Sequence, residues 1–356
     1  MYAGNIPAVP AVLHHCDTFK AMKRVLPLLL ALVSAGAAHA AKTLDITFVD
    51  VEGGQATLIV TPSGQSLLVD TGWRGFNGRD ANRIFEAAKK AHVKKLDYVL
   101  ITHYHRDHVG GAPNLTDRLP VDTWIDHGPP REDSKVVQVD FADYNHISKT
   151  HHAVVKPGDT IPLKGVEVTV VSSDGAVLGQ PLPGAGKTNP FCSTTEKRPA
   201  DKTENARSIG FVLSYGAFRF IDLGDLTWDK ELDLMCPDNK LGTVDVYLVS
   251  HHGWKESGSP ALVHALHPRV AIMDNGARKG GSPETWQIVR DSPGLEDLWQ
   301  LHYAVDGGTA HNSPDPFIAN VDEVCQGKPI VLTAMDDGSF TVTNTRNNYS
   351  KSYPAK

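Results

Sequence analysis

The sequence predicts an α/β protein in which two β-sheets pack against each other and helices cover the outside. Apolar segments with strand periodicity fall into two groups along the chain, and each group also contains segments with helical spacing. Polar residues follow directly after several of these strands, as they do where open α/β layers bind ligands. The chain from residue 41 is expected to form one domain of about 310 residues, with a long insertion that accounts for its size.

The first group of segments lies in the first half of the chain. Apolar residues predict strands over 44–50, 56–61, 66–70, 96–102 and 167–172, and a helix over 80–92. Residues 112–160 are expected to be rich in loops, with a short element at 123–126. Residues 174–204 are rich in Gly, Pro, Lys and Thr and are expected to form a long exposed excursion, of the kind that often serves as a lid or binding loop.

The second group follows this excursion. A hairpin is predicted over 208–214 and 218–223, with Tyr215-Gly216 at its turn. Further strands are predicted over 244–250, 270–273, 330–333 and 340–342, and helices over 260–266 and 283–290. After Ala40 the sequence predicts no transmembrane segment.

The first 40 residues have the composition of a targeting segment. Lys23-Arg24 precedes the apolar run 25–33, and small residues then end in Ala38-His39-Ala40, a pattern typical of a secretory signal peptide cleaved near Ala40. The apolar run is shorter than the about 20 residues that span a bilayer, which disfavours the alternative of a membrane anchor. Residues 1–21 are therefore interpreted as an upstream extension, 22–40 as a signal peptide, and 41–356 as an exported domain, periplasmic or secreted.

Charge and cysteine content narrow the function classes. The formal net charge is −6, and without residues 1–40 the chain has 32 basic and 40 acidic residues. No extensive basic face for nucleic acid or an acidic membrane is expected. Cys192, Cys236 and Cys325 remain after the signal peptide, and they are interpreted as structural, with one disulfide among them whose pairing the spacing leaves open.

Three polar groups stand immediately after apolar strands. They are His103-x-His105-x-Asp107-His108, then Asp225, and then His251-His252. Because strand ends converge in space, these dispersed side chains are predicted to form one metal site. Imidazole and carboxylate ligands without thiolate suit zinc, and also manganese or iron. Two ions about 3.5–4 Å apart, bridged by Asp225, would clamp both an attacking hydroxide and a leaving oxygen.

Each residue also has a simpler interpretation. A single histidine at a strand end is usually a surface or hydrogen-bonded residue, but four ligand-type residues within six positions are costly without a cation between them. Asp225 alone fits a turn. Asp70, which ends Leu-Leu-Val-Asp-Thr-Gly, is either a turn residue or the group that holds a ligand histidine through its second ring nitrogen.

These motifs resemble the metallo-β-lactamase superfamily, and in finer detail the nuclease-like domain of the DNA-uptake channel ComEC and its secreted relatives. The segments that carry the resemblance are His103–Gly111 with Leu67–Gly72, Phe48–Ala56, Glu204-Asn205 with Ser208, Phe220–Leu226, Ser250–Gly253 and His267–Ala271. The resemblance implies an αββα sandwich with a metal centre at one edge. It implies His103, His105, Asp107, His108, Asp225 and one of His251 or His252 as ligands.

The chain departs from the family pattern at several places near the expected cleft. The family's third-motif histidine is missing, and the segment Asn205-Ala-Arg-Ser208 stands in its place. Neutral Asn is a poor zinc ligand, so one metal position is expected to be weak, water-filled or vacant. His127, His146, His151 and His152 are available as substitutes, although their spacing does not favour them. Gly53-Gly54-Gln55-Ala56, Gly280–Pro283 and Trp254-Lys255 also replace the usual family residues.

The resemblance and the residues together predict metal-assisted hydrolysis by a metal-bound hydroxide. Asp107 would orient the hydroxide and take its proton, and His252 or Lys255 would help to stabilise charge on the substrate oxygen. One or two divalent ions, zinc first, are the expected cofactors. A phosphodiester-type substrate is predicted, small rather than long DNA because the chain is acidic. The alternatives are a lactam, lactone or other ester, or a non-catalytic binding protein with a degenerate site.

Overall fold

The computed structural model describes residue 1 and residues 42–356. The predicted signal peptide and almost all of the upstream extension lie outside the described residues. Residues 42–356 belong to one compact unit. Within this part of the chain, no helix combines the length and the apolar character that a membrane crossing requires.

The first sheet contains nine strands, most of them from the first half of the chain. Its spatial order is β19-β18-β17-β1-β2-β3-β4-β5-β6. The strands are β1 (Leu44–Phe48), β2 (Thr57–Val60), β3 (Ser66–Val69), β4 (Leu96–Leu100), β5 (Val121–Asp126), β6 (His152–Val154), β17 (Ile330–Ala334), β18 (Phe340–Asn344) and β19 (Tyr349–Tyr353). Pairing is parallel from β3 through β6 and antiparallel in the rest.

The second sheet contains eight strands in the order β16-β15-β14-β13-β11-β10-β7-β8. They are β7 (Glu167–Ser173), β8 (Ala176–Val177), β10 (Gly210–Tyr215), β11 (Phe218–Asp222), β13 (Val246–Leu248), β14 (Val270–Met273), β15 (Asp297–His302) and β16 (Ile318–Asn320). Pairing is parallel from β11 to β16. A separate two-stranded ribbon joins β9 (Lys187–Thr188) to β12 (Asp238–Asn239).

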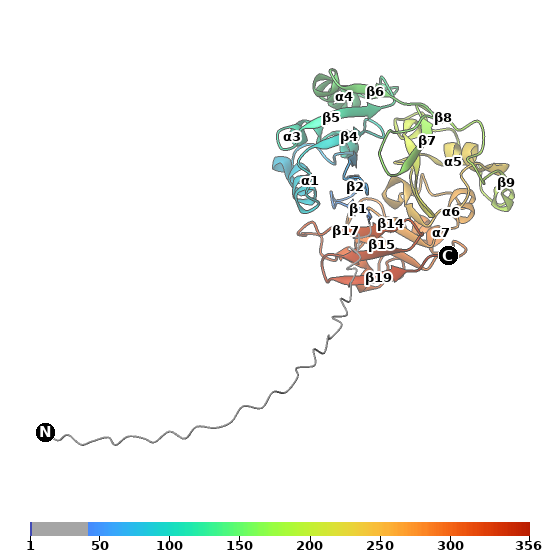
Figure 1. Ribbon diagram of the computed structural model, residues 1–356. Helices are drawn as coiled ribbons and strands as arrows, with labels where there is room; N and C mark the ends of the chain where they lie inside the picture. Colours follow the sequence, from blue (N-terminus) through green and yellow to red (C-terminus); the bar gives the residue numbers. More distant parts are fainter. Residues whose placement is uncertain (2–41) are drawn as a thin grey trace, which may run out of the picture. The chain divides into compact units, whose positions relative to one another are not determined.

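The helices divide between the outer faces of the two sheets. They are α1 (Arg79–Lys90), α2 (Arg106–Val109), α3 (Ala112–Thr116), α4 (Lys135–Ser148), α5 (Trp228–Met235), α6 (Pro260–Leu266) and α7 (Pro283–Arg290), with short 3₁₀ turns at η1 (Phe76–Gly78), η2 (Pro190–Ser193), η3 (Asn205–Arg207), η4 (Ser250–Gly253) and η5 (Asp315–Phe317). Figure 1 shows α1, α3 and α4 beside the first sheet and α5, α6 and α7 beside the second.

Three apolar clusters account for this layering. The central cluster joins inward side chains of both sheets, such as Phe48 and Leu332 from the first and Phe220 and Trp299 from the second. A second cluster packs the first sheet against α1, α3 and α4, and a third packs the second sheet against α5, α6 and α7. Because every strand layer buries apolar side chains on both faces, the order of layers is helix, sheet, sheet, helix. The predicted αββα sandwich is therefore confirmed.

The parallel strands bring polar residues from distant parts of the sequence to one edge. Asp70 follows β3, and the segment from His103 begins soon after β4. In the second sheet Asp225 follows β11, His251 follows β13 and Asp274 follows β14. These carboxyl ends meet where the two sheets face each other, which is the arrangement expected of a ligand site in α/β proteins.

The helix α4 is missing from the sequence prediction. Residues 112–160 are not mainly loops, because α4 occupies Lys135–Ser148. Its buried positions have helical spacing, but two of them are polar: Asp140 is paired with Arg74 and Arg106, and Ser148 is buried beside it on the same face. Val136 and Val139 on the same helix are apolar but exposed. Buried polar and exposed apolar residues therefore blur the helical periodicity of its sequence. The helix α5 and the strands β15, β16 and β19 were also missing from the prediction.

The excursion at 174–204 contains the short strands β8 and β9 and the turn η2. A disulfide joins Cys192 of this segment to Cys236 at the end of α5, 44 positions away. Arg198 lies over the ring of Trp228, donates to the carbonyl of Lys255 and pairs with Glu284 of α7 at 2.6 Å. The excursion is thus fastened to the second half of the sandwich at two separate points.

Candidate metal centre

Four ligand-type side chains form the centre of the site. Asp107, His108, Asp225 and His252 are all buried, and each offers one ligand atom within 4.8 Å of the others. His108 Nε2 lies 3.2 Å from an oxygen of Asp225 and 3.3 Å from Asp107 Oδ2. His252 Nε2 lies 3.3 Å from Asp107 Oδ2 and 3.4 Å from Asp225 Oδ1. Two carboxylates and two imidazoles therefore face one point from the ends of three different strands, β4, β11 and β13.

Three further histidines lie beside these four residues. His103 Nε2 lies 3.1 Å from His105 Nδ1 and 3.8 Å from Asp225 Oδ2. His251 Nε2 approaches the same Asp225 oxygen at 3.3 Å. Four imidazoles, those of His103, His108, His251 and His252, therefore approach the Asp225 carboxylate. Its role as a bridge between two ions stays a prediction.

Partners on the far side of each ring fix the orientation of the histidines. His108 Nδ1 lies 2.6 Å from Asp70 Oδ2. His252 Nδ1 lies 3.3 Å from Asp274 Oδ1, a charge contact without hydrogen-bond geometry. His105 presents its other nitrogen to Glu132 at 3.0 Å. Such contacts from carboxylates hold ligand histidines in register and make the inner nitrogen more basic.

Hydroxyl groups take the same role for the remaining two histidines. His103 Nδ1 lies 3.1 Å from Thr102 Oγ1 and 3.3 Å from Ser208 Oγ, while Ser257 Oγ lies 3.3 Å from His251 Nδ1. Thr102 Oγ1 donates to Asp70 Oδ2 at 2.7 Å, so it is free to accept from the ring of His103. Ser208 Oγ accepts the backbone N–H of Asp225, which links this carboxylate to His103.

The centre attracts positive charge. Burial raises the pKa of Asp225, but His108, His251 and His252 outweigh it and hold that pKa well below its usual range. Burial lowers the pKa of His108, yet Asp225, Asp107 and Asp70 raise it well above its usual range. Asp225 Oδ1 has no hydrogen-bond partner among the described residues. Buried acceptors of this kind are costly unless a cation or donor meets them, so the donor set fits a divalent metal.

A lysine that the sequence did not predict contacts the centre. Lys279 lies in the loop between β14 and α7, and its ammonium group pairs with Asp107 Oδ2 and donates to the carbonyl of Gly53 at 2.7 Å. Burial raises the pKa of Asp107, but Lys279 and then His108 lower it well below its usual range. Lys279 also lies 5.2 Å from the ring centre of Trp73, and both line a cavity of about 340 Å³.

The backbone around the ligands is tightly constrained. His251 and His252 both adopt left-handed φ angles, 54° and 55°. A residue other than glycine in this region costs on the order of 1–3 kcal/mol, and such strain is concentrated at functional sites. Gly111 explains the Gly-Gly end of the histidine motif, since a Cβ there would lie 2.1 Å from the carbonyl oxygen of Thr71.

The predicted site residues separate into two sets. Ten of them lie in the centre or hold its ligands, or stand next to a residue that does: His103, His105, Asp107, His108, Asp225, His251, His252, Asp70, Ser208 and Asn205, whose buried Oδ1 has no partner in the described chain. Lys255 instead lines a cavity of about 450 Å³ with Arg198 and Glu284. Its catalytic role stays a prediction.

The four substitute histidines have other surroundings. His127 pairs with Glu204 at 3.0 Å, and His152 pairs with Asp126 at 2.6 Å. His146 and His151 are exposed, on α4 and just before β6. His251 is therefore the additional imidazole that the structure places against Asp225.

Sequence reasoning missed Glu132, Ser257, Asp274 and Lys279. Asp274 follows the buried strand β14 directly, so the rule that found Asp225 would also have found it. The other three lie in loops, where no periodicity marks them.

The fold and the site together define a buried His/Asp ligand centre at the carboxyl edge of an αββα sandwich. Residues 49–188 match the family model of the metallo-beta-lactamase superfamily. This segment of the chain is thus similar to the metallo-beta-lactamase superfamily, whose members are generally metal-dependent hydrolases.

Named relatives agree with this assignment. ComE operon protein 3 of Bacillus subtilis is 24% identical over 252 residues, which cover 65% of this chain and 28% of that protein. Recombination protein 2 of Haemophilus influenzae is 23% identical over 236 residues, which cover 66% of this chain and 24% of that protein. The matched regions therefore span about a quarter of these curated relatives. The metallo-beta-lactamase fold protein YhfI from Bacillus subtilis has a solved structure with 13% identity and a TM-score of 0.45, covering 73% of this chain and 96% of its own.

Proposed function

We propose that this chain is an exported, metal-dependent hydrolase that acts on a phosphodiester-type substrate. The observation that carries the proposal is the common orientation of five imidazoles. Four of them have one ring nitrogen in hydrogen-bond contact with a carboxylate or hydroxyl, and His252 has one near Asp274. Each turns its other nitrogen toward the carboxylates of Asp107 and Asp225 or toward a neighbouring imidazole. This arrangement presents ligand atoms to cations at two adjacent positions.

The residues divide between two ions as follows. Asp107, His108 and His252 would hold one, and His103 and His105 the other, with Asp225 shared between them. His251 would take the place of the missing family histidine, because its Nε2 faces the Asp225 oxygen that His103 also approaches. Zinc is the first choice for nitrogen and oxygen ligands in a buried site. Divalent ions in such a pair supply hydroxide at neutral pH and polarise the substrate oxygen.

The chain's own residues position the reactants. Asp107 stays ionised at neutral pH because its pKa lies well below the usual range, so its carboxylate accepts a hydrogen bond from the attacking water and orients it. Lys279 brings an ammonium group to the same carboxylate and can exchange this partner for an anionic substrate oxygen. Trp73, whose ring lies beneath that ammonium group, would cover the apolar part of the substrate.

Several features favour a small phosphodiester. The resemblance to the ComEC-like branch favours phosphodiester chemistry, and Lys279 supplies the cation that a phosphate oxygen requires. The acidic composition disfavours long nucleic acid, because phosphate contacts dominate such binding. Export is supported by the signal-peptide pattern and by the Cys192–Cys236 disulfide, which suits an oxidising compartment.

Turnover of bis(p-nitrophenyl) phosphate by the zinc- or manganese-loaded chain tests the proposal. We expect metal-dependent release of p-nitrophenol and a loss of about 10³-fold in kcat for Asp107→Asn. Asp122→Asn is the matched control, since Asp122 is an exposed carboxylate paired with Lys95. Turnover of lactams, lactones or carboxyl esters, without turnover of the phosphodiester, would contradict the proposed substrate and identify the chain as a hydrolase of that other class. Bound metal without turnover on any of these substrates would leave a binding protein and refute the hydrolase.

A further inference from the structure

A second cluster of metal-ligand side chains lies beside the 50–55 turn. It consists of Asp50 and Glu52 after β1, His302 at the end of β15, and Cys325 in the loop before β17. Asp50 and His302 are buried, and Cys325 is the free cysteine of the described chain. None of these residues belongs to the His/Asp centre. We propose that the Asp50-Glu52-His302-Cys325 cluster binds one zinc-type divalent ion through a thiolate, an imidazole and carboxylate oxygens.

The spacing of the ligand atoms supports a tetrahedral ion. Bonds of about 2.0 Å to nitrogen or oxygen and 2.3 Å to sulfur place neighbouring ligand atoms about 3.3–3.8 Å apart. Cys325 Sγ lies 3.2 Å from Asp50 Oδ2, 3.8 Å from Glu52 Oε1 and 3.9 Å from His302 Nε2. His302 Nε2 lies 2.8 Å from Asp50 Oδ1, a hydrogen bond that the ion would replace. Asp50, His302 and Cys325 thus each offer a ligand atom within 4.8 Å of the other two, and Glu52 reaches this group through its contact with Cys325 Sγ.

The charges of the cluster also balance around a divalent ion. Two carboxylates and a thiolate carry three negative charges. The guanidinium group of Arg83 lies 3.2 Å from Asp50 and 3.1 Å from Glu52, and it contributes one positive charge. Arg79 also pairs with Glu52 at 2.6 Å, but Asp80 pairs with the same guanidinium group at 2.6 Å and offsets its charge. A divalent cation supplies the other two. Of the common divalent metals, zinc is the one that combines a soft thiolate with imidazole and carboxylate ligands in a tetrahedral site.

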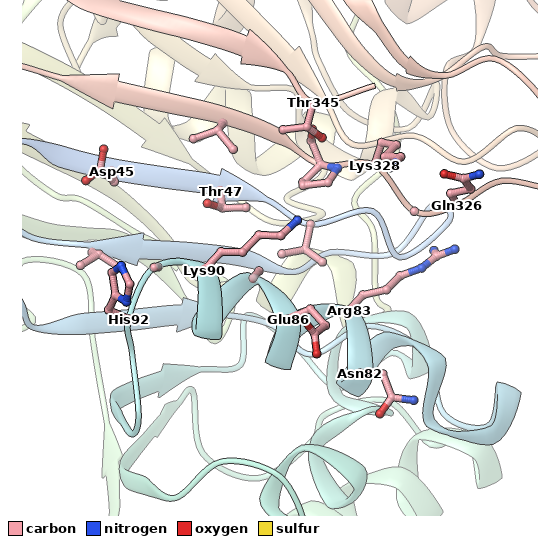
Figure 2. A pocket seen from close by; sticks show the side chains of 17 residues that line it. Asp45, Thr47, Asn82, Arg83, Glu86, Lys90, His92, Gln326, Lys328 and Thr345 are labelled. Carbon is pink, nitrogen blue, oxygen red and sulfur yellow. The ribbon is translucent and has the colours of Figure 1, made fainter. Parts of the chain in front are cut away.

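One cavity reaches the cluster itself, and a second is lined by neighbours of the cluster. Arg83 and Gln326, the neighbour of Cys325, line a cavity of about 560 Å³ between β1, α1 and the 326–331 segment, and Figure 2 shows both side chains at the same end of it. Glu52 and His302 also line the 340 Å³ cavity that contains Lys279. An ion therefore has a route from solvent, and the bound ion would tie the 320–330 loop to the turn that packs against Asp107.

Cobalt provides a specific test, because only a thiolate gives a near-ultraviolet sulfur-to-cobalt charge-transfer band. The His/Asp centre has nitrogen and oxygen ligands, and Cys192 and Cys236 are joined in a disulfide. We expect the band in the metal-free wild-type chain titrated with Co²⁺, and its loss in Cys325→Ser. The full chain also contains Cys16, and Cys325→Ser is the control for it.

Variants in each of the two clusters distinguish metal binding at the Asp50-Glu52-His302-Cys325 cluster from hydrolase activity at the His/Asp centre. Asp107→Asn should keep the thiolate band while losing turnover. Zinc should raise the melting temperature of Cys325→Ser and of a second variant, Cys325→Ala, by less than that of the wild type, with far-ultraviolet circular dichroism as the check on folding. A wild-type chain without the band, or a band that persists in Cys325→Ser, would overturn the proposal whatever the outcome for phosphodiester hydrolysis.

Discussion

At the scale of single residues, the site depends on which nitrogen each histidine turns inward. Asp70 holds His108, while Thr102 and Ser208 hold His103, and the Asp274 carboxylate lies 3.3 Å from the outer nitrogen of His252. These partners arrive from strand ends in both sheets, so the ligand geometry is a product of the fold and not of the histidine motif alone. A change in any partner should therefore weaken metal binding without removing a ligand, typically by 10–100-fold.

The contact between Lys279 and Asp107 makes a prediction at this scale. Lys279→Ala removes the ammonium group beside the centre, and we expect kcat/KM for an anionic phosphodiester to fall by about 10–100-fold, mainly through KM. Steady-state kinetics at several substrate concentrations measure the effect. Lys328→Ala is the control, because Lys328 lines the separate 560 Å³ cavity. An unchanged KM in Lys279→Ala would remove this lysine from the substrate site.

The candidate ligands could be predicted from the sequence more completely than the residues that contact and orient them. His103, Asp107 and His108 are recognisable because several ligand-type residues crowd into one short segment. Lys279 and Glu132 were missed, since each acts from a loop at a distance that only the fold fixes. Lys255 was chosen because it follows the His-His-Gly segment, yet the structure places it beside Arg198 and Glu284.

At the scale of elements, the turn after β1 supports the loop that carries the ligands. Gly54 packs against Asp107 so closely that a Cβ there would lie 2.4 Å from the carbonyl oxygen of Asp107. We expect Gly54→Ala to displace Asp107, to lower kcat/KM at least tenfold and to destabilise the fold by about 1–3 kcal/mol. Gly179→Ala is the matched control, because a Cβ at that position meets no atom within 4 Å. Wild-type activity in Gly54→Ala would show that the turn does not position Asp107.

A buried carboxyl group on α5 supports the segment that follows the two inward-facing histidines. Glu231 accepts the backbone N–H groups of Gly258 and Ser259, both at 2.7 Å. Burial raises its pKa to about 7, although these N–H groups lower it. The folded state therefore holds a proton that the unfolded chain releases near pH 4.5, and stability should decrease as the pH rises from 4.5 to 7.

Urea unfolding of the metal-free protein tests this pH dependence. Relative to Glu231→Gln, the wild type should lose on the order of 2–3 kcal/mol of unfolding free energy between pH 4.5 and pH 8. Two proteins with parallel stability curves over this range would contradict the assignment to Glu231.

Element prediction succeeded where apolar periodicity is clean. The helices α6 and α7 and the strand β14 have the predicted bounds, because their buried faces are apolar and a proline marks the start of each helix. The helix α4 was missed because ion-paired Asp140 occupies a buried position that is normally apolar. The spacing of apolar residues therefore reveals buried positions that are apolar, but it does not reveal a buried position that an ion-paired residue occupies.

At the scale of the whole molecule, the two sheets bring ligands together from segments about 150 residues apart. His108 and His252 approach within 3.2 Å, one after β4 of the first sheet and the other after β13 of the second. The sequence could predict two groups of strands, but the family resemblance was needed to pack them as a sandwich. The site is therefore sensitive to anything that shifts one sheet relative to the other.

The disulfide fastens the excursion at 174–204 to the end of α5 and so contributes to the stability of the whole molecule. It closes a loop between Cys192 and Cys236, 44 positions apart, and such a loop restricts the unfolded chain by about 4 kcal/mol. We expect the double variant Cys192→Ala with Cys236→Ala to lose about 2–4 kcal/mol of unfolding free energy in urea titrations. Addition of a reductant should destabilise the wild type but not the variant. A loss below about 1 kcal/mol would show that the excursion at 174–204 is held without the disulfide.

The central claim is that the strand-end cluster binds metal. Anomalous X-ray diffraction from zinc-loaded crystals of the protein locates each ion directly. The account predicts one peak among Asp107, His108, Asp225 and His252, with a second beside His103 and His105 on the other side of Asp225, and the loss of the first peak in Asp107→Asn. Crystals with saturating zinc and no anomalous peak between these side chains would contradict it.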